Sequence, residues 1–205
     1  MKYLKNFKFI GDVSMEDADI LAFYARNSNA ILEFGMGGST QILAQAKPEG
    51  AFLYSVDNFP KYRDRAMVFV NELGCADNVK AGLYSDLDLG TQQFDMVFND
   101  GMGQDRPVFA QRAWNNLKTG GVLLTHDTRH AVDFAPVLEF IKNNHNSISC
   151  VDINAIASNG CSSNITVIHK KEHEPYVNWN HTEGKPMWAY GADLEDLPAD
   201  RWNLI

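Results

Sequence analysis

The chain has 205 residues, of which 45% are hydrophobic, and this size suits one domain with a sizeable core better than two domains. Its formal net charge of −8 disfavours a long nucleic-acid surface, because phosphate contacts need clustered Lys and Arg. The sequence shows no signal-peptide pattern and no apolar run of about 18 residues, and its three cysteines fit no metal-ligand spacing. We therefore expect a cytoplasmic protein that binds a small-molecule substrate, without nucleic acid or membrane as partner. A homo-oligomer is compatible with these features.

Helices and strands alternate through the first half of the chain. Ser14 is suited to be an N-cap before acidic first-turn residues, and Gly74 is placed to close a later helix. The first two apolar strands end at Glu33 and Asp57. The elements expected here are a helix over 14–24, a strand over 30–32, a helix over 40–46, a strand over 51–56, a helix over 61–73 and a strand over 79–81.

The second half continues this alternation, and polar residues again follow the strands. Asp100 comes after one apolar strand, and His126 and Asp127 come after the next. The elements expected here are a strand over 94–99, a helix that includes Phe109, Ala113, Trp114 and Leu117, a strand over 121–125, and an antiparallel pair over 147–153 and 164–169. This order predicts a mostly parallel sheet with helices on both faces and the polar residues at its carboxyl edge.

The domain organisation follows from this order of elements. We expect a single domain with a helical extension over 1–29, a core over 30–170 and an acidic tail over 171–205. The tail holds Trp179, Trp188 and Trp202, and such a density of aromatic residues predicts packing on the core or on a partner.

A glycine-rich turn follows the first strand and indicates a cofactor site. Its sequence is Glu33-Phe34-Gly35-Met36-Gly37-Gly38-Ser39-Thr40, and Asp57 follows Gly35 at the distance expected of a ribose-binding acid. A nicotinamide dinucleotide fits poorly, because Glu33, Asp100 and Asp127 would repel its pyrophosphate. S-adenosylmethionine carries no phosphate and bears positive charge, so the same acids favour it.

These motifs resemble those of class I S-adenosylmethionine-dependent methyltransferases, and the resemblance covers about residues 30–130. It implies a Rossmann-like, seven-stranded, mostly parallel sheet with one reversed strand near the C-terminus. It also implies that the glycines of the turn line the methionine part, that Asp57 holds the ribose and that Gly82 and Leu83 lie beside the adenine. The cofactor-binding residues expected on this basis are Glu33, Gly35, Gly37, Ser39, Asp57, Gly82, Leu83 and Asp100.

Within that superfamily, the segments 94–101 and 120–128 resemble small-molecule O-methyltransferases related to catechol O-methyltransferase. The resemblance implies a divalent metal, Mg²⁺ or Mn²⁺, held by Asp100, His126 and Asp127. The chain departs from that group at two places. His126 stands where the group commonly has a carboxylate, and no lysine occurs between Asp100 and Lys118, where the catechol enzymes place the lysine that deprotonates the substrate.

These features predict methyl transfer from S-adenosylmethionine to a hydroxyl of a small-molecule or sugar-like substrate. Asp100, His126 and Asp127 are the expected catalytic residues. They act either as ligands of a metal that activates the acceptor or, without a metal, with His126 as general base. A non-catalytic module that keeps the fold is the alternative, because the lysine is absent and the metal position is altered. A NAD-dependent oxidoreductase is a weaker alternative.

Overall fold

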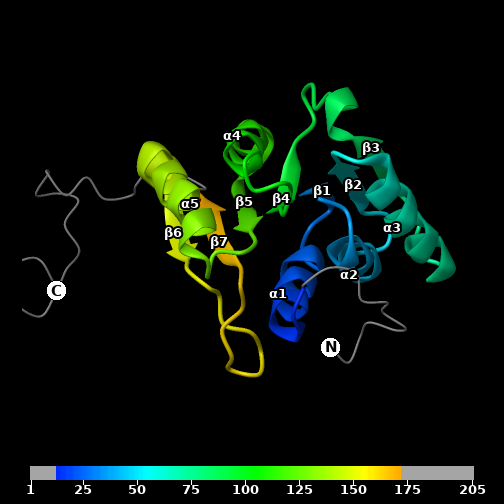
Figure 1. Ribbon diagram of the computed structural model, residues 1–205, viewed down its shortest axis with the longest axis horizontal. Helices are drawn as coiled ribbons and strands as arrows, with labels where there is room; N and C mark the ends of the chain where they lie inside the picture. Colours follow the sequence, from blue (N-terminus) through cyan, green and yellow to red (C-terminus); the bar gives the residue numbers. More distant parts are fainter. Residues whose placement is uncertain (1–12, 172–205) are drawn as a thin grey trace, which may run out of the picture. The chain divides into compact units, whose positions relative to one another are not determined.

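A computed structural model of the chain describes residues 13–171, which form a seven-stranded sheet flanked by helices (Figure 1). The strands are β1 (Ala30–Phe34), β2 (Phe52–Asp57), β3 (Val79–Leu83), β4 (Phe94–Asn99), β5 (Leu117–Thr125), β6 (Ile148–Asp152) and β7 (Thr166–Lys170). The helices are α1 (Met15–Ala25), α2 (Gly38–Ala46), α3 (Pro60–Glu72), α4 (Arg106–Asn116) and α5 (Ala131–Asn144), with short 3-10 turns at Tyr84–Asp86 and His145–Ser147. None of the helices within residues 13–171 is long and apolar enough to cross a membrane.

The strand order is β3-β2-β1-β4-β5-β7-β6. The pairs from β3 to β5 are parallel, and β7 runs antiparallel to both of its neighbours. The predicted mostly parallel sheet with one reversed strand near the C-terminus is therefore confirmed. Because β1, β2, β4 and β5 run in one direction, the polar residues that follow them meet at one edge of the sheet.

Alternate residues of the strands pack on opposite faces of the sheet, as the pleat requires. Ile31, Leu53 and Met96 belong to the core cluster that includes buried residues of α1, α2 and α3. Leu32 and Val97 point the other way, into the cluster formed with α4 and α5. Burial on both faces explains why these strands read as nearly continuous apolar runs in the sequence.

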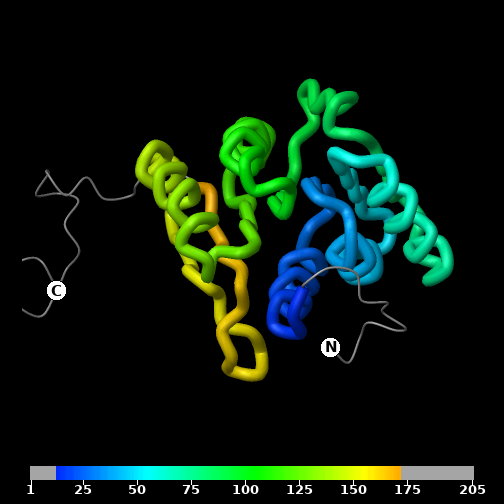
Figure 2. Tube along the Cα trace, viewed as in Figure 1, coloured from blue at the N-terminus to red at the C-terminus, as the bar shows by residue number. Residues whose placement is uncertain are grey.

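Helix α1 is tied to the connection between β6 and β7. Figure 2 shows this connection, in yellow, reaching past the sheet to lie beside α1, in blue. The Ser158 amide donates to Asp19 Oδ2 at 2.7 Å, and Asn159 donates to Glu16 at 2.9 Å. Ser14 caps α1 as predicted, in a capping box with Asp17. The connection between the last two strands of the chain thus contacts the helix that precedes β1.

Two local predictions were wrong or incomplete. Leu117 belongs to β5 and not to the preceding helix, since its backbone is extended and it pairs with Phe94. Its side chain is buried, and hydrophobicity alone does not separate a buried strand residue from a buried helix residue. Helix α5 was not among the expected elements, and its internal Pro136 is a residue that disfavours helix. The predicted packing of Trp179, Trp188 and Trp202 lies outside the described residues.

Candidate cofactor and active site

A cleft of about 390 Å³ opens at the carboxyl edge of the sheet. Its lining comes from the segments that follow β1, β2 and β4, together with Val13, which precedes α1. The chain proceeds from β1 to β2 on one side and later to β4 on the other, so the cleft lies where the strand order reverses. Predicted cofactor residues that line the cleft are Gly35, Gly37, Ser39, Asp57 and Asp100. Predicted site residues that do not line it are Glu33, Gly82, Leu83, His126 and Asp127.

The glycine turn after β1 is held by hydrogen bonds that its amides donate to the end of β2 and to the first turn of α2. The Met36 amide donates to Asp57 Oδ2 at 2.9 Å, and the Gly37 amide donates to Thr40 Oγ1 at 3.0 Å. Asp57 Oδ1 accepts from the Phe59 amide at 2.8 Å. Asp57 therefore fixes the turn after its own strand and the turn after β1 at the same time. Leu83 lies beside Asp57 in the strand register, on the far side of β2 from the turn.

Glu33 is buried behind the turn, where it binds Ser39, and it does not line the cleft. Its side chain is fully buried, and it accepts hydrogen bonds from Ser39 Oγ at 2.5 Å and from Ser55 Oγ at 2.6 Å. Burial raises the pKa of this carboxyl to about 7, against the opposing effect of the serine hydroxyls. As placed here, Glu33 orders Ser39 at the first turn of α2. Its predicted contact with the cofactor stays a prediction.

The raised pKa of Glu33 gives a pH dependence of stability that can be measured. Because the pKa rises from 4.5 to about 7 on folding, its stabilising contribution is complete below pH 4.5 and is lost as pH rises through about 7. Between about pH 4.5 and 8, wild type should lose about 3 kcal/mol of unfolding free energy relative to Glu33→Gln. Urea denaturation at several pH values measures this difference.

Glu49→Gln, at an exposed position, is the control for this prediction and should show the same pH dependence as wild type. Parallel curves for wild type and Glu33→Gln would contradict the argument.

Asp100, His126 and Asp127 meet beside the cleft, as predicted from their strand ends. Three of their ligand atoms lie within 4.8 Å of one another. His126 Nδ1 lies 3.1 Å from Asp100 Oδ1 and 3.4 Å from Asp127 Oδ1. Burial raises the pKa of Asp100, which the contacts with His126 and Arg106 partly oppose. The pKa of Asp127 is lowered, because hydrogen bonding and charge attraction to Arg106 and His126 outweigh its burial.

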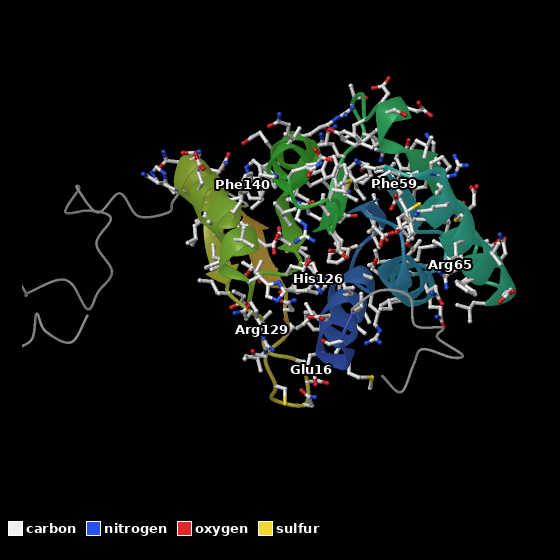
Figure 3. All side chains as sticks on the ribbon, viewed as in Figure 1. Glu16, Phe59, Arg65, His126, Arg129 and Phe140 are labelled. Carbon is white, nitrogen blue, oxygen red and sulfur yellow. The ribbon has the colours of Figure 1, made fainter. Side chains whose placement is uncertain are left out.

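His126 is enclosed between carboxylates on both sides of its ring. It is fully buried, and its Nε2 lies 3.3 Å from Asp17 Oδ2 in the first turn of α1. Figure 3 shows His126 at the end of β5, next to this helix. Burial alone would lower its pKa, but the hydrogen bonds with Asp100 and Asp17 outweigh it and raise the pKa to about 10. A ring in this setting is suited to remain protonated, which disfavours His126 as general base.

Arg106, the first residue of α4, extends into the same group. Its Nη2 donates to Asp127 Oδ2 at 2.6 Å and to Asp100 Oδ1 at 3.1 Å. Its Nε donates to the Gly101 carbonyl at 2.8 Å, and its Nη1 donates to the His126 carbonyl at 3.2 Å. Only 11% of the side chain is exposed. The guanidinium therefore joins the end of β4 to the end of β5.

Sequence reasoning missed Arg106 and Asp17. Arg106 stands six positions after Asp100, and the need to balance the charge of the predicted carboxylates was a signal that could have indicated it. Asp17 was interpreted only as a first-turn acid of α1, and nothing in its local sequence indicates that it contacts His126. These two residues complete a network in which Asp17, Asp100, Asp127 and Asp133 surround the side chains of His126 and Arg106.

Comparison with known proteins finds no matching family model and no matching curated protein. Solved structures do match the fold. The O-methyltransferase TomG from Streptomyces achromogenes, in complex with S-adenosylmethionine, has a TM-score of 0.65 and 23% identity, covering 78% of this chain and 82% of that one. The O-methyltransferase from Bacillus cereus, in complex with S-adenosylhomocysteine, has a TM-score of 0.62 and 19% identity, covering 82% and 84%.

A methyltransferase from Podospora anserina, PaMTH1, bound to S-adenosylhomocysteine, also matches, with a TM-score of 0.60 and 16% identity over 78% of this chain and 80% of that one. This chain has the fold of S-adenosylmethionine-dependent O-methyltransferases. The resemblance inferred from the glycine turn and the strand ends is thereby confirmed at the level of the fold.

Proposed function

We propose that this protein transfers a methyl group from S-adenosylmethionine to a hydroxyl of a small-molecule or sugar-like substrate. The observation that carries the proposal is the cleft, in which the glycine turn, Asp57 and Asp100 come together at the point where strand order reverses. The presence of S-adenosylmethionine or S-adenosylhomocysteine in the similar structures supports the same cofactor.

The cleft offers each part of the cofactor a matching group. Backbone atoms at Gly35 and Gly37 are open to the methionine part. Each carboxylate oxygen of Asp57 accepts one backbone amide, and its second lone pair remains for a ribose hydroxyl. Phe59 and Tyr62 line the cleft with 44% and 41% of their surface exposed, and so present apolar area to a ligand.

Asp100 is the residue best placed to take the acceptor proton. It lines the cleft, and its contacts with His126 and Arg106 both use Oδ1, so that Oδ2 can accept from a substrate hydroxyl. The raised pKa of Asp100 makes it a stronger base than an exposed aspartate. The deprotonated oxygen attacks the methyl carbon as the carbon–sulfur bond breaks, and the sulfonium becomes a neutral thioether.

The predicted divalent ion would be a second way to activate the acceptor. The ligand atoms of Asp100, His126 and Asp127 are close enough to share one ion. A metal there would act as a Lewis acid that lowers the pKa of the acceptor hydroxyl. Arg106, however, already donates to two of these carboxylates.

Replacing Asp57 by alanine should weaken the binding of S-adenosylhomocysteine by about 1.5–3 kcal/mol, the range for hydrogen bonds to a charged group. The loss has two sources, because Asp57 accepts from the ribose and also holds the Met36 amide in the glycine turn. Isothermal calorimetry measures the affinity. Asp77→Ala, at an exposed position before β3, is the control and should bind like wild type. Equal affinity of wild type and Asp57→Ala, or tighter binding of NAD than of S-adenosylhomocysteine, would overturn the assignment.

Turnover distinguishes the enzyme from a non-catalytic module of the same fold. Release of S-adenosylhomocysteine from S-adenosylmethionine should occur with a hydroxylated acceptor from a small-molecule panel and should fall sharply in Asp100→Asn. Binding without turnover across such a panel favours the module. The cytoplasmic location, the absence of nucleic-acid and membrane partners, and a homo-oligomer stay predictions.

A further inference from the structure

The oxygens that a metal would need in this site already contact a cation of the chain. Arg106 Nη2 lies 2.6 Å from Asp127 Oδ2 and 3.1 Å from Asp100 Oδ1. Mg²⁺ sits about 2.1 Å from its oxygen ligands and needs near-octahedral space around it. An ion that bridged both carboxylates would therefore have to displace the guanidinium. As the side chains stand, the site does not fit a bound divalent ion.

Arg106 is fixed by more than the two aspartates. Its Nε and Nη1 donate to the carbonyls of Gly101 and His126, and Asp133 Oδ1 lies 3.7 Å from Nη1. Gly101 and His126 are buried residues, so expelling the side chain would leave two buried backbone carbonyls without this donor, which carries a cost for each group. A guanidinium also stays charged at every accessible pH, so it cannot lose its attraction for the carboxylates by deprotonation.

We propose that Arg106 is the resident cation of this site, where it takes the place of a divalent metal and makes the protein indifferent to Mg²⁺ and Mn²⁺. Arg106 is then a positioning residue. It draws Asp100 Oδ1 toward the end of β5 and leaves Oδ2 for the cleft. This role in the reaction rests on the proposed function, whereas metal binding can be measured whether or not the protein transfers methyl groups.

The test is a calorimetric titration of the full chain with Mn²⁺, without cofactor or substrate. Wild type should show no binding up to about 1 mM, the weak end of oxygen-ligand sites. Arg106→Ala removes the competing charge and leaves Asp100, His126 and Asp127 together, so it should bind Mn²⁺ at least about tenfold more tightly than wild type. Arg112→Ala, on the same helix and with the same change of charge, is the matched control and should resemble wild type.

Two outcomes would overturn the proposal. Binding of Mn²⁺ to wild type that Asp100→Asn and Asp127→Asn abolish would show that the metal displaces Arg106. A folded Arg106→Ala variant with no gain in Mn²⁺ affinity would show that Arg106 is not what excludes the metal. If Arg106→Ala does not fold, Arg106→Gln, which keeps the length but not the charge, takes its place. Thermal unfolding of wild type gives an independent readout, because its midpoint should not change with Mn²⁺ or EDTA.

Discussion

Replacing Asp17 by leucine is expected to lower the free energy of unfolding by about 3–5 kcal/mol, the cost of removing one partner from a buried ion pair, although Asp100 and Asp127 still face Nδ1 of His126. Asp17 is 1% exposed, and its Oδ2 lies 3.3 Å from His126 Nε2. Its Oδ1 accepts from the Asn164 amide at 2.6 Å. The substitution therefore removes the carboxylate that faces the buried Nε2 of His126 and, at the same time, the acceptor of the partly buried Asn164 amide. Urea denaturation, monitored by circular dichroism, measures the effect.

Asp19→Asn is the matched control for this prediction. Asp19 lies on the same helix and also accepts an amide from the β6–β7 connection, that of Ser158, but no described buried cation lies against it. Its substitution should cost about 1 kcal/mol or less, as for one hydrogen bond near the surface. Asp17→Asn keeps the shape and an acceptor oxygen but loses the charge, so its effect should fall between the two. A loss for Asp17→Leu no larger than that for Asp19→Asn would show that His126 needs no partner from α1.

The strands and their polar ends could be predicted because the information is local. Glu33, Asp57 and Asp100 each follow a short apolar run, and parallel strands bring their carboxyl ends to one edge whatever the loops do. The glycine turn could be interpreted for the same reason, since its residues are adjacent in the chain. Local patterning therefore predicts which side chains share the cleft edge.

The charge network could not be predicted, because its members are far apart in sequence. Asp17 and His126 are 109 positions apart, and their contact depends on how α1 packs against the end of β5. The burial of the Glu33 side chain is also a result of packing. A strand-end acid can point toward the ligand or away from it, and here Ser39 and Ser55 hold it beneath the turn. Sequence patterns set which residues approach the site, whereas packing decides which of them face it.

Replacing Gly35 by alanine should abolish measurable binding of S-adenosylhomocysteine and destabilise the fold by about 3 kcal/mol or more, as the sum of left-handed strain and overpacking. Gly35 has φ of +90°, and a Cβ there would lie 2.2 Å from the Asp100 carbonyl oxygen. That oxygen cannot move alone, because the Asp100 amide donates to the Phe34 carbonyl at 2.8 Å. The clash would therefore separate the ends of β1 and β4, between which the cleft opens.

Gly50→Ala separates this clash from the backbone conformation. Gly50 has φ of +78°, yet nothing lies within 4 Å of an added Cβ. Its substitution should cost only the strain of a left-handed alanine, about 1–2 kcal/mol, and should leave the affinity for S-adenosylhomocysteine unchanged. Thermal unfolding and calorimetry on both variants measure the two effects. Since strain is common to both positions, any further loss in Gly35→Ala measures the contact between the β1 and β4 loops. Equal behaviour of the two variants would mean that this contact is not needed for the cofactor.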